Sequence, residues 1–301
     1  MVRQTAKKRP GLIRENRQDR IFLGIVLAVS VLILIIELYP LIFVVSASFS
    51  DSDAISLGQV YLWPVRPNLK GYQTLMNDKS ILLGFKNSVM YLLAGTSINM
   101  FLTTLLAYPL SRREMPGRNI ITFFVAMTMY ISGGLIPTFL LTSSLGMVDT
   151  LWGVIMPNAI ATTNMIIMRT YFTSSIPDSL YEAATLDGCN YTRYLLRIVL
   201  PLSKPILAVI SLYYAVGHWN NYFDALIYLR STSKQTLQLV LRNILLANQV
   251  NAGDGGYSEA AKLGVTIKYS VIVFSCIPMM IAYPFVQKFF VKGVMIGAIK
   301  G

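Results

Sequence analysis

The sequence contains six apolar runs, each long enough to cross the hydrocarbon core of a bilayer, which is about 30 Å thick and takes about 20 helical residues. The runs lie near 21–49, 85–110, 119–141, 151–172, 205–229 and 264–289. A water-soluble domain has about 25% charged residues. This chain has 13% charged and 54% hydrophobic residues, so we predict an all-α integral membrane protein, a bundle of six helices.

The first 20 residues are strongly basic. Seven of them are Lys or Arg, and the first apolar run follows directly. Such a start is also typical of a cleaved secretion signal, and the small residues Ser46, Ala47 and Ser48 would suit a cleavage site. The apolar core of a signal is about 7–15 residues long, and the run at 21–49 is nearly twice that. We therefore expect this run to remain as the first helix.

Lys and Arg are distributed unequally between the two sides of the predicted bundle. Counting alternate connections gives 17 on the side of both termini and 9 on the opposite side. Because cytoplasmic loops of membrane proteins are enriched in Lys and Arg, both termini are predicted to be cytoplasmic. The chain then divides into a basic N-terminus, a six-span domain and a cytoplasmic tail, at 1–20, 21–290 and 291–301. The six-span domain includes a cytosolic connection at 177–201 and outer connections at 50–84 and 230–263.

The net charge of +12 does not indicate nucleic-acid binding. The basic residues lie at the ends of apolar runs rather than in a patch interleaved with aromatic side chains, which favours membrane orientation. The two cysteines, Cys189 and Cys276, have no metal-ligand spacing and fall in segments where a disulfide is not expected. The single histidine, His218, has no second ligand at a suitable spacing. No metal site and no redox chemistry are predicted.

The connection at 177–201 has the pattern of a helix–turn–helix. Pro177 and Asp178 give a helix start, with the acid near the positive end of the helix dipole. Gly188 can take a positive φ, so the backbone can turn there. A second short helix is expected over 191–197, and Leu200-Pro201 should end it before the next span. Two short helices that bury little against their own chain are expected to bind a partner.

The spacing within this connection resembles the EAA motif of binding-protein-dependent ABC importer permeases. The matching positions are Glu182-Ala183-Ala184, Gly188, Ile198 and Leu200-Pro201. The run Gly217-His218-Trp219-Asn220 also agrees, and the tail at 289–301 is similar to the C-terminus of the second permease subunit in maltose-type sugar importers. The stretch at 132–137 looks like the branch that handles complex oligosaccharides. The resemblance implies a six-helix type I ABC importer permease bundle and a role in sugar uptake.

The resemblance also implies which subunit hydrolyses ATP and which part of this chain contacts it. The connection would be the coupling helix, seated on an ATP-hydrolysing subunit, with Glu182 paired to a basic residue there. The coupling residues would be Glu182, Ala183, Ala184, Asp187, Gly188, Ile198, Leu200 and Pro201. The chain has no G-x-x-x-x-G-K-[ST] segment, so it is expected to bind no cofactor and to be no enzyme, with ATP and Mg²⁺ in the partner. The expected partners are an ATP-binding subunit dimer, a second permease subunit, an extracytoplasmic solute-binding protein and the lipid of a bacterial cytoplasmic membrane.

The fifth apolar run carries many polar and aromatic side chains. Amides and a carboxylate can hydrogen-bond sugar hydroxyls, and aromatic rings can stack on a sugar ring. The candidate substrate-path residues are Tyr214, His218, Trp219, Asn220, Asn221 and Asp224. The same side chains would equally suit interhelical contacts and an aromatic belt at the outer interface, so both interpretations stay open. Glu37, in the first run, fits an interfacial or paired position better than a substrate role.

The outer connection at 230–263 predicts an amphipathic helix followed by a glycine-rich tip. The apolar positions are Leu237, Leu239, Val240, Leu241, Ile244, Leu245 and Leu246, and the tip lies at 253–256. We expect this connection and the one at 50–84 to receive a solute-binding protein.

Two other functions are consistent with a multi-span chain. An ion-gradient-driven secondary transporter needs ion-coordinating acids or broken helices near the midplane, and only Glu37 and Asp224 are candidates. A membrane enzyme needs a nucleophile–base pair or a metal cluster, and no loop carries one. Neither function explains the helix–turn–helix at 177–201, so the importer permease is preferred.

Overall fold

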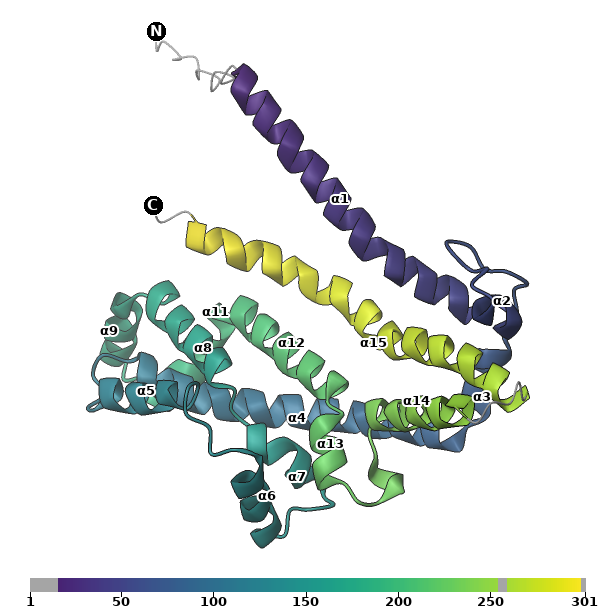
Figure 1. Cartoon of the computed structure of the whole chain (residues 1–301). Coiled ribbons are helices and arrows are strands. Elements are labelled where there is room, and N and C mark those ends of the chain that lie inside the picture. Colours follow the sequence, from purple (N-terminus) through teal and green to yellow (C-terminus); the bar gives the residue numbers. More distant parts are fainter. Residues whose placement is uncertain (1–15, 254–258, 299–301) are drawn as a thin grey trace.

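The computed structural model describes residues 16–253 and 259–298, which form a bundle of helices (Figure 1). The helix α4 (Lys79–Ser111) is its spine, because α8, α12 and α14 all pack along it. The elements in chain order are α1 (Arg17–Ser48), α2 (Ser52–Ser56), α3 (Lys70–Asn77), α4 (Lys79–Ser111), α5 (Arg118–Met127), α6 (Leu135–Ser144), α7 (Leu151–Ile155), the 3-10 helix η1 (Met156–Asn158), α8 (Thr162–Ser175), α9 (Asp178–Leu186), α10 (Tyr191–Tyr194), the π-helix η2 (Leu195–Val199), α11 (Leu200–Leu202), α12 (Lys204–Asn220), α13 (Phe223–Tyr228), the 3-10 helix η3 (Thr232–Lys234), α14 (Leu237–Gly253) and α15 (Glu259–Ala298).

Three of the six predicted spans form unbroken helices that are long and apolar enough to cross a bilayer: α1, α4 and the Gly264–Ile281 part of α15. The most apolar of them, α1, has a mean hydropathy of 3.0 over a window in which no residue is buried. Its buried residues are Ser46, Ala47 and Ser48, at its C-terminal end, where it packs against α15. The remaining apolar surface of α1 must face lipid or another chain, because exposing it to water is unfavourable.

The third and fourth predicted spans are interrupted. The prediction of one helix over 119–141 is wrong, because α5 ends at Met127 and α6 begins only at Leu135. Gly134, which precedes α6, has a φ of 84°, a backbone region that favours glycine. Over 151–172, α7 and η1 are followed by α8 after a bend of 57°. Breaks of this kind are tolerated in membrane bundles where neighbouring groups satisfy the freed backbone.

The fifth span also differs from the prediction. The expected helix over 205–229 ends at Asn220, and after a break at Asn221 and Tyr222 the chain continues as α13. The sixth, α15, is longer than the predicted 264–289 at both ends. These breaks and extensions change the boundaries of the spans and leave the all-helical architecture intact.

The helix predicted in the outer connection is confirmed as α14, and it packs more deeply than a surface helix would. Leu237, Leu239 and Leu241 are buried, and α14 lies against both α4 and α15. Gly84 of α4 allows the close approach, because a Cβ there would lie 3.2 Å from the Leu237 backbone. The predicted tip lies almost wholly outside the described residues.

Two apolar clusters hold the bundle together at opposite ends of α4. One joins the C-terminal end of α4 to α8, α12 and the residues that follow α8. The other joins the N-terminal end of α4 to α3, α12, α14 and α15 around Trp219. Between membrane helices, such clusters stabilise the bundle by close packing rather than by removal from water. The two clusters therefore fix α12 against α4 along the length that carries the candidate substrate-path residues.

A carboxylate clamps two connections on the side opposite to α9. Asp149 accepts hydrogen bonds from the backbone amides of Arg230 and Ser231, both at 3.0 Å, and from Lys234 Nζ at 2.9 Å. These hydrogen bonds, first of all the one from the Ser231 hydroxyl, hold the pKa of Asp149 well below its ordinary value. This Asp149 clamp joins the connection after α6 to the connection before α14.

Candidate functional site

The connection at 177–201, which we call the coupling segment, forms the predicted helix–turn–helix. The α9 helix begins directly after Pro177, and the chain turns at Gly188, whose φ is 74°. The turn is closed by backbone hydrogen bonds from Gly188 N to Thr185 O at 3.0 Å and from Cys189 N to Ala184 O at 2.9 Å. The positive φ predicted for Gly188 is therefore confirmed.

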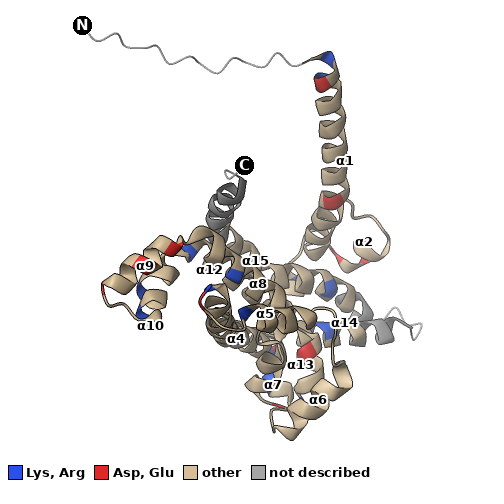
Figure 2. Cartoon of the chain, turned by 90° about the vertical axis from the view of Figure 1, so that its left-hand side faces the viewer, with Lys and Arg blue, Asp and Glu red and all other residues tan. Residues whose placement is uncertain are grey.

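The outer surface of α9 is exposed, and Asp178 at its start forms an ion pair with Arg113 at 3.3 Å. Figure 2 shows α9 and α10 at one edge of the molecule, away from α14 and α1. Glu182, Ala183 and Asp187 are exposed, and Leu186 is 89% exposed. Among the described residues, no cation lies within ion-pair distance of Glu182. Leu186 and the carboxylates of Glu182 and Asp187 therefore leave this surface available to another protein.

The inner surface of the coupling segment is anchored more firmly than the sequence predicts. Tyr194 is fully buried, and the Arg112 guanidinium lies 4.4 Å from the ring centre of Tyr181 and 5.3 Å from that of Tyr194. The Tyr108 hydroxyl donates to Tyr191 O at 3.2 Å. Burial raises the pKa of Tyr194, so its phenol stays protonated. The expectation that the segment buries little against its own chain is wrong.

Arg112, Tyr108 and Tyr194 form this anchor, and the sequence does not single them out for it. Arg112 is 6% exposed, and its one ionic contact among the described residues is Glu114 at 3.7 Å. A guanidinium stacked on two aromatic rings is favourable even where few hydrogen bonds are made. The partners of Arg112 lie about 70–80 positions further along the chain, so only the fold brings them together.

The second half of the coupling segment is also wound differently from the prediction. Ile198 and Leu200 are half-buried against the first apolar cluster, and Pro201 is exposed. The expectation that Leu200-Pro201 ends the helix is wrong, since helical turns continue through Leu202. Pro201 is separated from the π-helix η2 by one residue, so it lies near the end of a continuous helical stretch over Tyr191–Leu202. The chain bends by 84° at Ser203 instead.

Two of the candidate substrate-path residues make contacts between helices. The Tyr214 hydroxyl lies 2.6 Å from Thr103 Oγ1 on α4 and accepts from Ala161 N at 3.0 Å. His218 Nε2 lies 3.1 Å from Asn99 Nδ2, also on α4. Both Tyr214 and His218 are buried. Their surroundings are those of polar contacts between packed helices.

Two further candidates build the junction between α12 and α13. Asn221 Nδ2 donates to Asp224 Oδ2 at 2.8 Å, and the Asp224 amide donates to Asn221 Oδ1 at 3.1 Å. Asn158 Nδ2 adds a third contact, to Asp224 Oδ2 at 3.2 Å. This arrangement satisfies polar groups at the break in the fifth span. Glu37, by contrast, lies on the exposed surface of α1.

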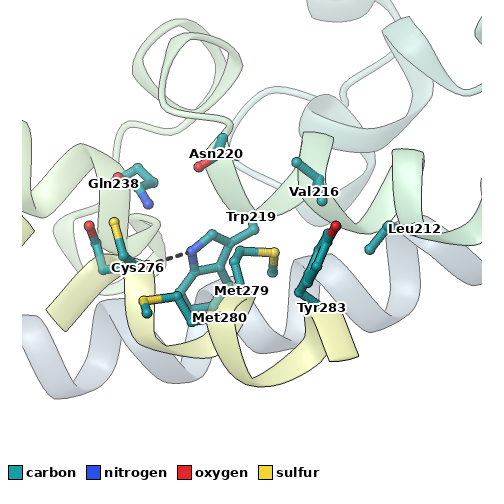
Figure 3. Close-up of a pocket in the computed structure, with 10 residues that line it drawn as sticks. Leu212, Val216, Trp219, Asn220, Gln238, Cys276, Met279, Met280 and Tyr283 are labelled. Atoms are coloured by element: carbon teal, nitrogen blue, oxygen red, sulfur yellow. Dashed lines mark hydrogen bonds between the residues drawn. The ribbon is translucent and has the colours of Figure 1, made fainter. Parts of the chain in front are cut away.

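The last two candidates, Trp219 and Asn220, border a cavity of about 630 Å³ between α12, α14 and α15 (Figure 3). Trp219 is 1% exposed, and its Nε1 donates to Ser275 O at 2.9 Å, the dashed line in Figure 3. Asn220 is exposed and faces the same space as Gln238 of α14. A cavity of this size suits a small solute. Among the described residues, no group of three or more His, Cys, Asp or Glu side chains is placed to hold a metal ion.

Comparison with known proteins relates most of the chain to one family. Residues 99–296 match the family described as binding-protein-dependent transport system inner membrane component. The chain is 39% identical to the polygalacturonan/rhamnogalacturonan transport system permease protein YtcP of Bacillus subtilis, over 94% of this chain and 100% of that protein. It is 36% identical to protein LplC of the same organism, over 93% of each chain.

Solved structures agree with these relatives. A chain of a bacterial ABC transporter involved in the import of the acidic polysaccharide alginate matches with a TM-score of 0.81 and 36% identity, over 91% of this chain and 98% of that one. A chain of bacterial alginate ABC transporter in complex with an alginate pentasaccharide-bound periplasmic protein matches with a TM-score of 0.59 at 16% identity, over 90% of this chain and 93% of that one, a likeness of fold.

Proposed function

The chain belongs to the family of binding-protein-dependent transport system inner membrane components, and from this premise we propose that it lines an import path for oligosaccharides. It is a permease subunit of an ABC importer and not an enzyme. ATP hydrolysis in such importers belongs to a partner subunit, so ATP and Mg²⁺ are expected there. The two rival functions, secondary transporter and membrane enzyme, account for neither the family match nor the coupling segment.

The exposed surface of α9 carries the proposed coupling function. The Arg112 anchor fixes the inner surface of the segment to the end of α4, while Glu182, Leu186 and Asp187 face outward. A partner that covers this surface must supply an apolar pocket for Leu186 and a cation or donor for Glu182, because a buried carboxylate is costly without one. We assign this partner as the ATP-binding subunit dimer.

Oligosaccharide transport is supported by what similar proteins are named for. Relatives include the polygalacturonan/rhamnogalacturonan permease and, at 28% identity over 89% of this chain and 92% of that protein, the arabinooligosaccharides transport system permease protein AraQ of Bacillus subtilis. Of the candidate substrate-path residues, Asn220 is both exposed and at the cavity, so it is the best placed to bind a hydroxyl. The other candidates are assigned to packing between helices.

The outer connections are the proposed docking surface for a solute-binding protein. Trp63 is 81% exposed and Tyr61 63% exposed, both in the connection between α2 and α3. Exposed aromatic side chains are enriched at protein interfaces. The Asp149 clamp holds the neighbouring connection before α14 in a fixed shape. The 17-to-9 distribution of Lys and Arg supports the matching orientation, with both termini and the coupling segment in the cytoplasm.

Uptake by the reconstituted complex tests the coupling function. Gly188→Val should abolish ATP-driven uptake, because a residue with a Cβ is strained by about 1–2 kcal/mol at the positive φ of the turn. Gly117→Val is the matched control, since Gly117 has a φ of 72° and equally open surroundings but precedes α5, outside the coupling segment. Glu182→Lys should abolish uptake through charge, and an acidic substitution at the basic partner should restore part of it.

The decisive comparison is between the two glycine variants. Both complexes should assemble, and only the Gly188 variant should lose uptake and solute-stimulated ATP hydrolysis. Normal transport by Gly188→Val and Glu182→Lys, or equal loss in the Gly117 control, would remove the coupling assignment.

A further inference from the structure

The cavity between α12, α14 and α15 has two side-chain amides at one end, and the other end is apolar except for the hydroxyl of Tyr283 (Figure 3). Leu212 and Val216 line it lower on α12, with Met279 and Met280 opposite on α15. Asn220, at the end of α12, places an amide at the other end. The eight positions from Leu212 to Asn220 span about 12 Å of helix, so the polar end lies toward the outer connections.

A cation lies one helical turn from the polar end, outside the residues that line the cavity. Gln238 of α14 borders the cavity, and Arg242 follows it by one helical turn on the same face. The Arg242 guanidinium carbon lies 5.9 Å from the ring centre of Tyr222, which is 44% exposed at the break after α12. Thr236 holds α14 to this break, because its hydroxyl donates to Asn221 O at 3.3 Å.

No acid neutralises the charge of Arg242 among the residues whose side chains the structure describes. No carboxylate of these residues lies within 4.0 Å of it, and its own side chain is half-buried. Two other cations of the outer connections are paired: Lys234 binds Asp149, and Arg66 lies 3.8 Å from Asp51. A guanidinium with no carboxylate beside it among the described residues is available to bind an anion.

We propose that Arg242 and Tyr222, with Asn220 and Gln238, form a subsite for the carboxylate of a uronate-type sugar residue. Guanidinium binds a carboxylate through two parallel hydrogen bonds, which a hydroxyl cannot match. The Tyr222 ring offers a flat apolar surface to the sugar ring, and the two amides can bind its hydroxyls. The assignment rests on the proposed oligosaccharide import and narrows its substrate class to acidic oligosaccharides.

The test compares an acidic solute with its neutral ester. Proteoliposomes holding the complete importer and its solute-binding protein take up trigalacturonate or its trimethyl ester in the presence of ATP. Arg242→Gln should lower trigalacturonate uptake about 10-fold or more, the loss expected for a hydrogen bond to a charged group, and leave ester uptake little changed. Arg242→Lys should keep part of the acid preference, because it keeps the charge and loses the bidentate geometry.

Lys268→Gln is the matched control, since Lys268 also lies over a tyrosine, Tyr269 at 5.6 Å, but no residue one helical turn from it lines the cavity. It should leave both uptakes unchanged. An unaltered ratio of acid to ester uptake in Arg242→Gln overturns the subsite, whether both rates stay normal or both fall together. If the unmodified importer takes up neither solute with ATP present, the proposed oligosaccharide import fails instead.

Discussion

His218 and Gly95 show how a single small residue sets the spacing of two helices. A Cβ at Gly95 would clash with His218 Nε2, and the ring cannot retreat freely because it is buried and contacts Asn99. Gly95→Ala should therefore destabilise the chain by about 1–3 kcal/mol through overpacking. The measurement is the thermal unfolding temperature of the purified complex.

Gly217 supplies the control for that measurement, since it is helical and nothing lies within 4 Å of the position that a Cβ would take there. Gly217→Ala should be neutral or stabilising, because alanine favours a helix over glycine by about 1 kcal/mol. If the two substitutions have the same effect on Tm, the contact between Gly95 and His218 does not set the helix spacing.

Trp219 and Asn220 are neighbours with different expected roles. Trp219→Ala should cost about 3–5 kcal/mol of stability, because the indole is buried against Phe85 and donates to Ser275 O. Asn220→Ala should change the free energy of unfolding by no more than about 0.5 kcal/mol, and should lower uptake about 3- to 10-fold by removing one hydrogen bond to the solute. An uptake rate equal to that of the unmodified protein in Asn220→Ala, with Tm unchanged, would exclude Asn220 from the path.

Individual residues differ in how far the sequence predicts them. Gly188 is predictable, because a turn between two short helices requires a positive φ and glycine takes it without strain. The role of Arg112 is not predictable from the sequence, because it depends on Tyr181 and Tyr194. Only the packing of the coupling segment brings these two residues near Arg112. The sequence identifies Trp219 as aromatic and Asn220 as polar, and only the fold separates the buried one from the exposed one.

Among the helices, some are predictable from composition alone, and others depend on packing contacts that the sequence does not show. Long apolar runs predict α1 and α4 well, since hydropathy alone requires those residues to avoid water. The prediction over 119–141 fails because no charged residue marks the break between α5 and α6, where Gly133-Gly134 precedes the new helix. The break after Asn220 is equally hidden, because it depends on side-chain contacts of Asp224 with Asn158 and Asn221.

The Asp149 clamp gives a prediction about pH for the connection before α14. Its folded pKa lies below the ordinary value of about 3.9, so its contribution to stability is fully present above that pH and is lost as the pH falls through the folded pKa. Asp149→Asn should lower stability equally from about pH 5 to 8, and the difference from the unmodified protein should shrink only below about pH 4. Asparagine accepts the positive φ of 59° at this position, which limits the change to the lost charge.

Hydrogen exchange localises that effect. The amides of Arg230 and Ser231 should exchange faster in Asp149→Asn at neutral pH, because the carboxylate accepts from both. Unchanged protection of these amides would show that the clamp does not hold the connection.

In the complete molecule, several surfaces of the helix bundle are left uncovered by the chain itself. The long α1 leaves its apolar sides uncovered, and Figure 1 shows its N-terminal half standing apart from the other helices. The exposed side of the coupling segment and the cavity also lie at different places on the surface of the bundle. Lipid, a sister permease and an ATP-binding subunit together account for these surfaces, which agrees with a subunit that functions only in an assembly.

The orientation of the bundle in the membrane is itself a prediction. The roles proposed for the coupling segment and for the outer connections both depend on it. Cys189 is a native probe, since it is a free, half-buried cysteine beside Gly188 in the coupling segment. With Cys276→Ser removing the other thiol, a membrane-impermeant maleimide should label Cys189 in inside-out vesicles and not in intact cells. Asp254→Cys, placed in the outer connection with Cys189→Ser as well, should show the reverse pattern. Labelling of Cys189 from outside would invert the topology, because the coupling segment could not then meet ATP-hydrolysing subunits in the cytoplasm.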